Sequence, residues 1–227
     1  MGSVLFRLSG DCGGTSARPR RRRRPAGLRV IQAQGKQATI APMTYYGANQ
    51  IAASFRTVRN NTLKIADDIP EDKYGFRAAE GMRTVAQTLI HISNAPRFAF
   101  AVNRDKVLST MEGFDFMGFI APIAASEQQP MTKAQIVARL TEGGDEYEGW
   151  VKTLSDDFLG QSVSSPPGGN PASRTRFEML LSVKEHEMHH RGQLMLIERI
   201  LGVVPHLTRE QEARRAALIA AAATAKS

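Results

Sequence analysis

The feature that most constrains this chain is the stretch from Thr175 to Leu201, which has the pattern of one long amphipathic helix. Thr175 and Glu178 have the spacing of a capping box, and Gly202 and Pro205 provide an end signal. The apolar residues of the stretch recur at the 3.6-residue period of a helix that buries one face. They are Met179, Val183, Leu194, Ile197 and Leu201.

Two histidines interrupt the centre of this apolar stripe. His186 and His190 are spaced i and i+4, so they lie about 6 Å apart along one face of the helix. Burying two imidazoles on an apolar face is costly unless something binds both, and a divalent metal is the usual solution. The stretch therefore predicts a metal site on a buried helix.

Three further stretches have the same helical period. They run from Thr44 to Ile69, from Thr84 to Leu108 and from Thr132 to Phe158. No segment shows the alternation of a strand, and the Pro-, Gly- and Ser-rich residues 160–173 are expected to form a loop. Together these patterns predict an all-α fold, a four-helix bundle with long connections.

The basic charge of the chain is concentrated before residue 43. Residues 1–42 hold nine of the 30 Lys and Arg but one of the 22 Asp and Glu, which leaves 21 of each in the remainder. The body therefore has no charge signature of nucleic-acid binding. Composition indicates a disordered tail with three open interpretations: sequence upstream of an effective start at Met43, an arm that binds nucleic acid or another anionic surface, and an Arg-rich targeting peptide.

The expected organisation is thus a basic tail (1–42), a bundle domain (43–207) and an alanine-rich C-terminal helix or tail (208–227) that packs weakly. Thr208 is expected to cap the last helix, and His206 to lie at the surface in the turn before it. No window has the roughly 18 apolar residues of a membrane span, and no secretory signal is evident. We therefore expect a cytoplasmic protein with no membrane partner.

His91, beside the apolar stripe of the second helix, is the candidate for a third metal ligand. A lone histidine there is usually a packed core or boundary residue, so His91 gains weight only from the pair elsewhere. Three imidazoles hold a zinc-class ion at about 2.0–2.1 Å and leave a position open, as catalytic sites do. His189 competes with His190 for the ligand position, but His190 continues the apolar stripe and is preferred.

The connection 109–131 is long for a compact domain, which indicates either a functional segment or a short helix. Phe114, Phe116 and Phe119 follow one another closely within it. Two interpretations stay open, namely packing over the bundle and a lid over a substrate pocket.

The runs KEHEMHHRGQL (184–194) and IPEDKYGFRAAEGMRTVAQTLIHI (69–92) resemble the DinB-like or YfiT-like superfamily, and the resemblance extends over roughly residues 43–208. This superfamily includes bacillithiol- and mycothiol-dependent transferases and is unrelated to the DNA polymerase of similar name. Its fold is a four-helix bundle in which one histidine of the second helix and an HxxxH pair of the last bind a divalent cation. The resemblance thus assigns the ligands to His91, His186 and His190, and it implies a homodimer.

The function implied by this resemblance is a metal-dependent thiol S-transferase or hydrolase that acts on a small molecule. The metal would bind a low-molecular-weight thiol as thiolate. Zinc and nickel are the favoured metals, and iron and manganese stay open because histidine ligands alone do not choose among them. Gln193, Arg191 and His189 are candidates to contact the ligand rings, and no catalytic residue is assigned. The alternatives are a non-catalytic metal-binding sensor and nucleic-acid binding through the tail.

Overall fold

The computed structural model describes residues 46–225. The predicted basic tail, the boundary at residue 43 and the predicted helix start at Thr44 lie outside this range. The helices are α1 (Ala48–Asp68), α2 (Val85–Phe100), α3 (Phe116–Glu127), α4 (Lys133–Val151), α5 (Asp156–Gly160), α6 (Arg176–Ile200) and α7 (His206–Thr224), with a 3-10 turn η1 (Glu71–Lys73), a π-helical turn η2 (Ala101–Asp105) and two strands, β1 (Ser162–Ser164) and β2 (Ser173–Thr175).

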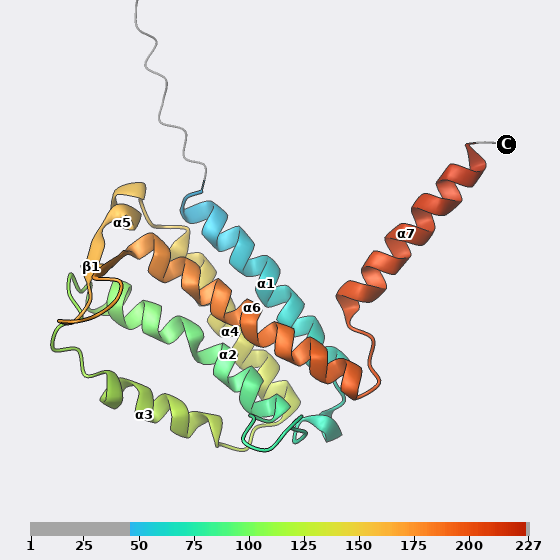
Figure 1. Cartoon of the computed structure of the whole chain (residues 1–227), viewed down its shortest axis with the longest axis horizontal. Coiled ribbons are helices and arrows are strands. Elements are labelled where there is room, and N and C mark those ends of the chain that lie inside the picture. Colours follow the sequence, from blue (N-terminus) through green and yellow to red (C-terminus); the bar gives the residue numbers. More distant parts are fainter. Residues whose placement is uncertain (1–45, 226–227) are drawn as a thin grey trace, which may run out of the picture. The chain divides into compact units, whose positions relative to one another are not determined.

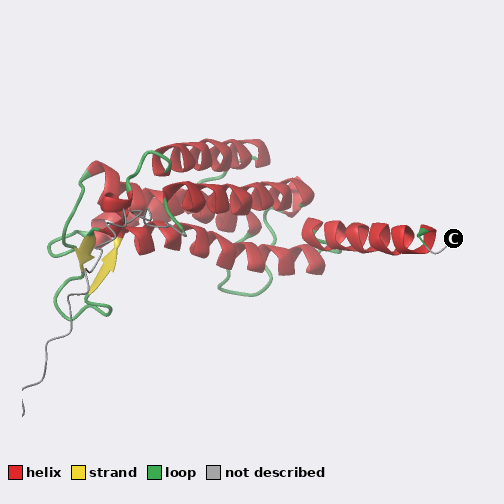
Figure 2. Ribbon diagram, turned by 90° about the horizontal axis from the view of Figure 1, so that it is seen from above, coloured by secondary structure: helices red, strands yellow, loops and turns green. Residues whose placement is uncertain are grey.

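Four of these helices form a bundle. Helices α1 and α2 each pack against both α4 and α6, so the order around the bundle is α1, α4, α2, α6 (Figure 1). Helix α3 lies outside this set and packs on α2. Figure 2 shows the same helices from above, with the strands confined to one end. The predicted all-α four-helix bundle is confirmed, and none of the described helices is long and apolar enough to cross a bilayer.

Capping boxes stabilise the first turns of bundle helices α6 and α4. The hydroxyl of Thr175 accepts a hydrogen bond from the backbone N–H of Glu178, whose carboxylate accepts one from the Thr175 backbone. A second box, between Thr132 and Gln135 at the start of α4, forms in the same way. Each box satisfies N–H groups that a helix end leaves without partners.

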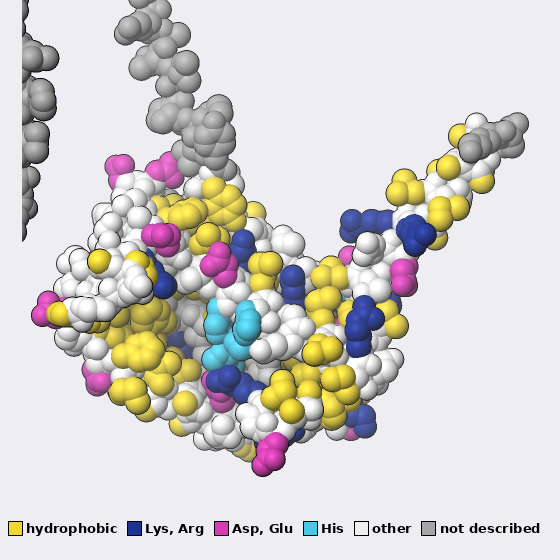
Figure 3. All heavy atoms as spheres, in the orientation of Figure 1, with side chains coloured by type: hydrophobic (Ala, Val, Ile, Leu, Met, Phe, Trp, Pro, Cys, Tyr) yellow, Lys and Arg dark blue, Asp and Glu magenta, His cyan; other side chains and the backbone are white. Residues whose placement is uncertain are grey.

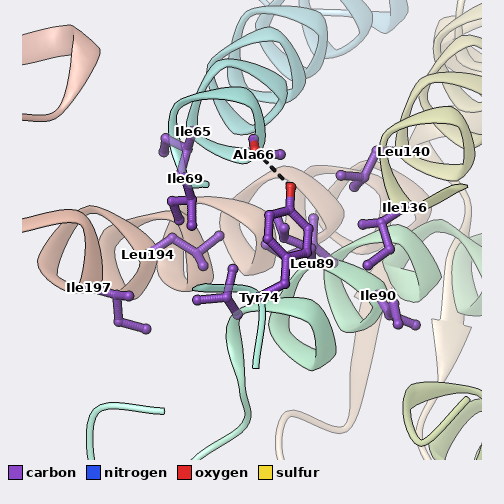
Figure 4. Close-up of a cluster of buried hydrophobic side chains, with 12 residues drawn as sticks. Ile65, Ala66, Ile69, Tyr74, Leu89, Ile90, Ile136, Leu140, Leu194 and Ile197 are labelled. Carbon is purple, nitrogen blue, oxygen red and sulfur yellow. Dashed lines mark hydrogen bonds between the residues drawn. The ribbon is translucent and has the colours of Figure 1, made fainter. Parts of the chain in front are cut away.

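The core consists of apolar side chains from all four bundle helices. Figure 4 shows the cluster at one end, where Ile65 of α1, Leu89 of α2, Leu140 of α4 and Leu194 of α6 are fully buried. The hydroxyl of Tyr74, which is also buried there, donates a 2.7 Å hydrogen bond to the Ala66 carbonyl. A phenol buried in an apolar cluster needs such a partner, and this one ties the loop after α1 to its last turn.

Several element boundaries differ from the expectation. The second helix ends as an α-helix at Phe100 rather than Leu108, because the chain passes through η2 and reaches Val107 with φ at +45°. The third ends at Val151, so Phe158, the predicted end of this helix, lies in the separate helix α5. The connection 109–131 contains α3, which agrees with one of the two expectations for it.

Three further expectations were wrong. The predicted loop contains an antiparallel hairpin in which Ser162 pairs with Thr175 and Ser164 with Ser173. Its strands have three residues each, too few for alternation to be visible in the sequence. Helix α7 begins at His206, with Pro205 rather than Thr208 as the N-cap. His206 is buried rather than at the surface, and its Nε2 donates a 3.2 Å hydrogen bond to the Asn61 side-chain oxygen of α1.

Candidate metal centre

Helices α2 and α6 run side by side and bring three histidines together. His186 and His190 lie one turn apart on α6, and His91 faces them from α2. The His186 Nε2 is 3.0 Å from the His91 Nε2 and 3.2 Å from the His190 Nε2. Two nitrogens bound to one tetrahedral or octahedral ion at about 2.0–2.1 Å are themselves roughly 3.0–3.4 Å apart. Both distances from His186 therefore match the spacing that one ion requires, and the ligand nitrogens of all three histidines lie within 4.8 Å of one another.

The other ring nitrogen of two of these histidines is held by a hydrogen bond. The His91 Nδ1 donates to the Glu127 carboxylate at 2.7 Å, and the His190 Nδ1 donates to the Gln193 side-chain oxygen at 2.8 Å. A ring that carries its proton on Nδ1 keeps a lone pair on Nε2, which is the atom that faces the other histidines. These contacts fix the tautomers and orientations that metal binding needs.

Burial keeps the pair on α6 uncharged near neutral pH. Burial, followed by the proximity of His190 and His91, lowers the pKa of His186 to about 4. Burial also lowers the pKa of His190, although the Gln193 hydrogen bond opposes this effect. A metal competes with protons for imidazole nitrogen, so a histidine that is neutral before binding loses no affinity to protonation.

Glu127 is the polar residue of the centre that the sequence analysis missed. Burial opposes its ionisation, but hydrogen bonds from Arg83 and His91 outweigh burial and hold its pKa below the ordinary value. Arg83 donates from Nε to the second carboxylate oxygen at 2.7 Å. The one available signal was that Glu127 is the single charged residue in the stretch 116–131. Only the packing of α3 on α2 shows where it points.

The remaining candidates have different surroundings. The exposed His189 accepts a 3.2 Å hydrogen bond from the Gln193 side-chain nitrogen, so it touches the group that orients His190. Arg191 is half-buried, and its Nε has no hydrogen-bond partner among the described residues. Within residues 46–225, no hydrogen bond joins the Arg191 side chain to any of the three histidine rings.

A buried ion pair fixes the helix that carries two of the histidines. Glu187, next to His186, points into the bundle, where Arg59 of α1 donates from Nε and Nη2 to its carboxylate at 2.9–3.1 Å. Both side chains are fully buried, and Arg59 Nη1 also donates to the Leu140 carbonyl of α4. A buried pair with these hydrogen bonds holds one rotation of α6, because any other would strand a charge.

A cavity of about 330 Å³ opens beside His91 and His186. Phe98 of α2, Phe116, Phe119 and Ile123 of α3 and Met179 of α6 are among the residues that line it. Of the three phenylalanines singled out from the sequence, Phe114 is absent from the lining. Its ring packs against Phe98 and Phe119 at centroid distances of 5.9 and 5.7 Å, so it supports the wall from behind.

The sequence of residues 54–194 matches the model of the DinB superfamily, a range that spans most of the bundle and all three histidines. The chain belongs to the DinB superfamily. The family resemblance predicted from the two motifs is thereby confirmed.

Two relatives of this chain, YjoA and YfiT, are distant from it in sequence. YjoA of Bacillus subtilis, an uncharacterised protein, is 22% identical over 157 residues, which cover 68% of this chain and 91% of YjoA. Its crystal structure has a TM-score of 0.50 and covers 67% of this chain and 92% of that one, at 21% identity. B. subtilis YfiT, described as "a probable metal-dependent hydrolase with an unusual four-helix bundle topology", has a TM-score of 0.54 at 14% identity and covers 71% of this chain and 91% of YfiT. At these identities the likeness establishes the fold.

Proposed function

We propose that this DinB-superfamily protein is a metal-dependent enzyme that joins a low-molecular-weight thiol to a small apolar electrophile, with His91, His186 and His190 as the metal ligands. One observation carries the proposal: three imidazole nitrogens converge at 3.0 and 3.2 Å, and two of their rings line an apolar cavity. Three protein ligands leave room for a further ligand, which is typical of catalytic sites. A divalent ion held there lowers the pKa of a thiol or water that joins it.

The protein's own residues have three tasks in this proposal. Glu127 and Gln193 hold the protons on Nδ1 of His91 and His190, so that the lone pairs on Nε2 face the centre. The phenyl rings of Phe98, Phe116 and Phe119 bind an apolar acceptor and exclude water from the cavity. Arg83 keeps Glu127 ionised and in place.

The composition of the cavity wall favours a thiol over water as the nucleophile. Apart from His91 and His186, which the proposal assigns to the metal, no His, Asp, Glu or Lys is among the described residues that line it, so the wall offers no free general base. A thiol has an unperturbed pKa of about 8.5, whereas that of water is about 15.7, so the thiol needs far less activation. With a chlorinated aromatic acceptor, a carbon–sulfur bond forms, the carbon–chlorine bond breaks, chloride leaves, and the thiol proton passes to solvent.

Hydrolysis is the second candidate, and the description of YfiT as a probable metal-dependent hydrolase favours it. The same residues would then act on an ester or amide without any thiol. A bundle that binds metal and catalyses nothing is the remaining interpretation. A homodimer and a cytoplasmic location stay predictions from the sequence.

The test is a conjugation assay with 1-chloro-2,4-dinitrobenzene or an epoxide and a panel of small thiols, with and without chelator. We expect conjugation that chelator abolishes and added zinc or nickel restores. His186→Ala should abolish it, and His189→Ala should retain it. Conjugation that is indifferent to chelator, or none with any thiol in metal-loaded protein, would refute the transferase. Chelator-sensitive ester cleavage without thiol would establish the hydrolase in its place.

A further inference from the structure

The three histidines have a cavity on each of two sides. On α2, residues after His91 line the apolar cavity, among them Phe98, and residues before it line a second cavity, among them Gln87. On α6 the order is reversed, with Met179 at the apolar cavity and Ile197 at the second. Helices α2 and α6 are antiparallel, so this reversal means that the two cavities follow one another along one groove between the helices. The histidines separate them, since His91 and His186 border the first and His190 the second.

The second cavity has about twice the volume of the first, about 640 Å³ against 330 Å³, and a different chemistry. Its wall includes two arginines, Arg77 and Arg83, and the amides of Gln87, Gln128 and Gln193. Its one carboxylate, Glu127, already accepts hydrogen bonds from Arg83 and His91. The apolar cavity, in contrast, has Asn94 and Ser182 as its polar residues apart from the histidines. Figure 3 shows the histidine side chains reaching the surface with Lys or Arg side chains directly beside them and a hydrophobic area on the same face.

The two arginines of the second cavity differ in their availability. Arg83 is engaged with Glu127, whose other oxygen holds His91. Arg77 is exposed and forms no ion pair among the described residues. Its guanidinium is therefore free to bind a carboxylate or phosphate, and Gln87 and Gln128 add neutral hydrogen-bonding groups nearby.

We propose that the two cavities bind the two reactants separately: a hydrophilic, anionic thiol cosubstrate lies in the Arg77 cavity, and the apolar electrophile lies in the Phe98 cavity, with the three histidines between them. This inference rests on the proposed transferase function and adds the class and the place of each substrate. A thiol whose carboxylate contacts Arg77 enters from the His190 side, and the acceptor meets it from the side of His91 and His186. Arg77 is thus a specificity residue for the thiol.

Equilibrium binding tests this arrangement without depending on catalysis. The probes are S-methylglutathione, a hydrophilic anion with a blocked thiol, and N-phenyl-1-naphthylamine, an uncharged apolar fluorophore. They are titrated into zinc-loaded full-length protein. The variants are Arg77→Glu, which reverses the free charge, and Ser182→Phe, which fills the apolar cavity. Arg215→Glu, which makes the same charge change on the exposed part of α7, is the matched control.

The two probes should respond to different variants. Arg77→Glu should weaken S-methylglutathione binding about tenfold and leave the fluorophore unaffected. Ser182→Phe should abolish fluorophore binding and leave S-methylglutathione unaffected, and Arg215→Glu should change neither. Both probes should bind at once. Competition between them, or an unchanged S-methylglutathione affinity in Arg77→Glu, would overturn the inference.

The binding experiment and the conjugation assay can fail independently of each other. If the probes divide between the cavities but no conjugation occurs, the two-sided site stands and the transferase fails. If conjugation is chelator-sensitive but the probes compete, the transferase stands and the two-sided site fails. In active protein, Arg77→Glu should also raise the KM for the thiol and leave the KM for the acceptor unchanged.

Discussion

The contact between Glu127 and His91 gives a sharp prediction for metal affinity. The carboxylate oxygen lies 2.7 Å from the His91 Nδ1, and the Glu127 side chain is only 7% exposed. Such outer contacts typically contribute 10- to 100-fold to metal affinity, or about 1.4–2.7 kcal/mol. Glu127→Gln keeps an acceptor of the same shape but loses the charge, so we expect about a tenfold weaker zinc affinity. Glu127→Ala loses the hydrogen bond as well, so we expect a loss close to 100-fold.

The assay is competition for zinc against a chromogenic chelator at pH 7.5, with thermal unfolding to confirm that each variant folds. Glu112→Gln is the control, because it removes the same charge from an exposed position in the preceding loop. The reasoning is refuted if Glu127→Ala binds zinc as tightly as the wild type, or if Glu112→Gln loses as much affinity as Glu127→Gln.

Three further predictions concern the rest of the chain. Glu187→Ala leaves Arg59 buried without its partner and should lower the free energy of unfolding by about 3–5 kcal/mol in urea titrations. The double change Arg59→Met and Glu187→Leu should lower the free energy of unfolding much less, and equal losses in the two variants would contradict this. Glu198 is buried with neither carboxylate oxygen hydrogen-bonded among the described residues, and burial, followed by the proximity of Asp68, raises its pKa to about 7 from 4.5. The folded state therefore holds this proton more tightly than the unfolded state, so the stability of the protein falls as pH rises from about 4.5 to 7. Glu198→Gln should be about 1–3 kcal/mol more stable than the wild type at pH 8 but not at pH 4. Thermal unfolding that shows the same difference at both pH values would exclude this account. Deleting residues 1–42 should leave the unfolding midpoint unchanged and abolish any salt-sensitive DNA binding, and a truncated body that still binds DNA would show that its neutral composition is misleading.

The parts of the site that the sequence predicted are those fixed by local geometry. His186 and His190 share a face because the spacing i, i+4 places them there in any α-helix. The capping box at Thr175 likewise depends on four consecutive residues. The pairing of His91 with them needed information from outside the helix, which the family resemblance provided.

The parts that the sequence did not predict depend on how distant segments pack. No pattern in the chain shows that Glu187 meets Arg59 inside the core. Glu127 contacts His91 because α3 packs on α2, which helical periodicity does not encode. The division of the groove into an apolar and a basic cavity likewise arises from three segments that lie far apart in the sequence.

The central claim is that His91, His186 and His190 together bind one divalent ion. Its most direct test is elemental analysis of anaerobically purified protein after reconstitution with zinc or nickel and desalting, for the wild type, His186→Ala and His189→Ala. The account predicts one tightly bound ion per chain in the wild type and in His189→Ala, and none in His186→Ala. Equal metal content in the wild type and His186→Ala, at one ion or at none, would contradict it.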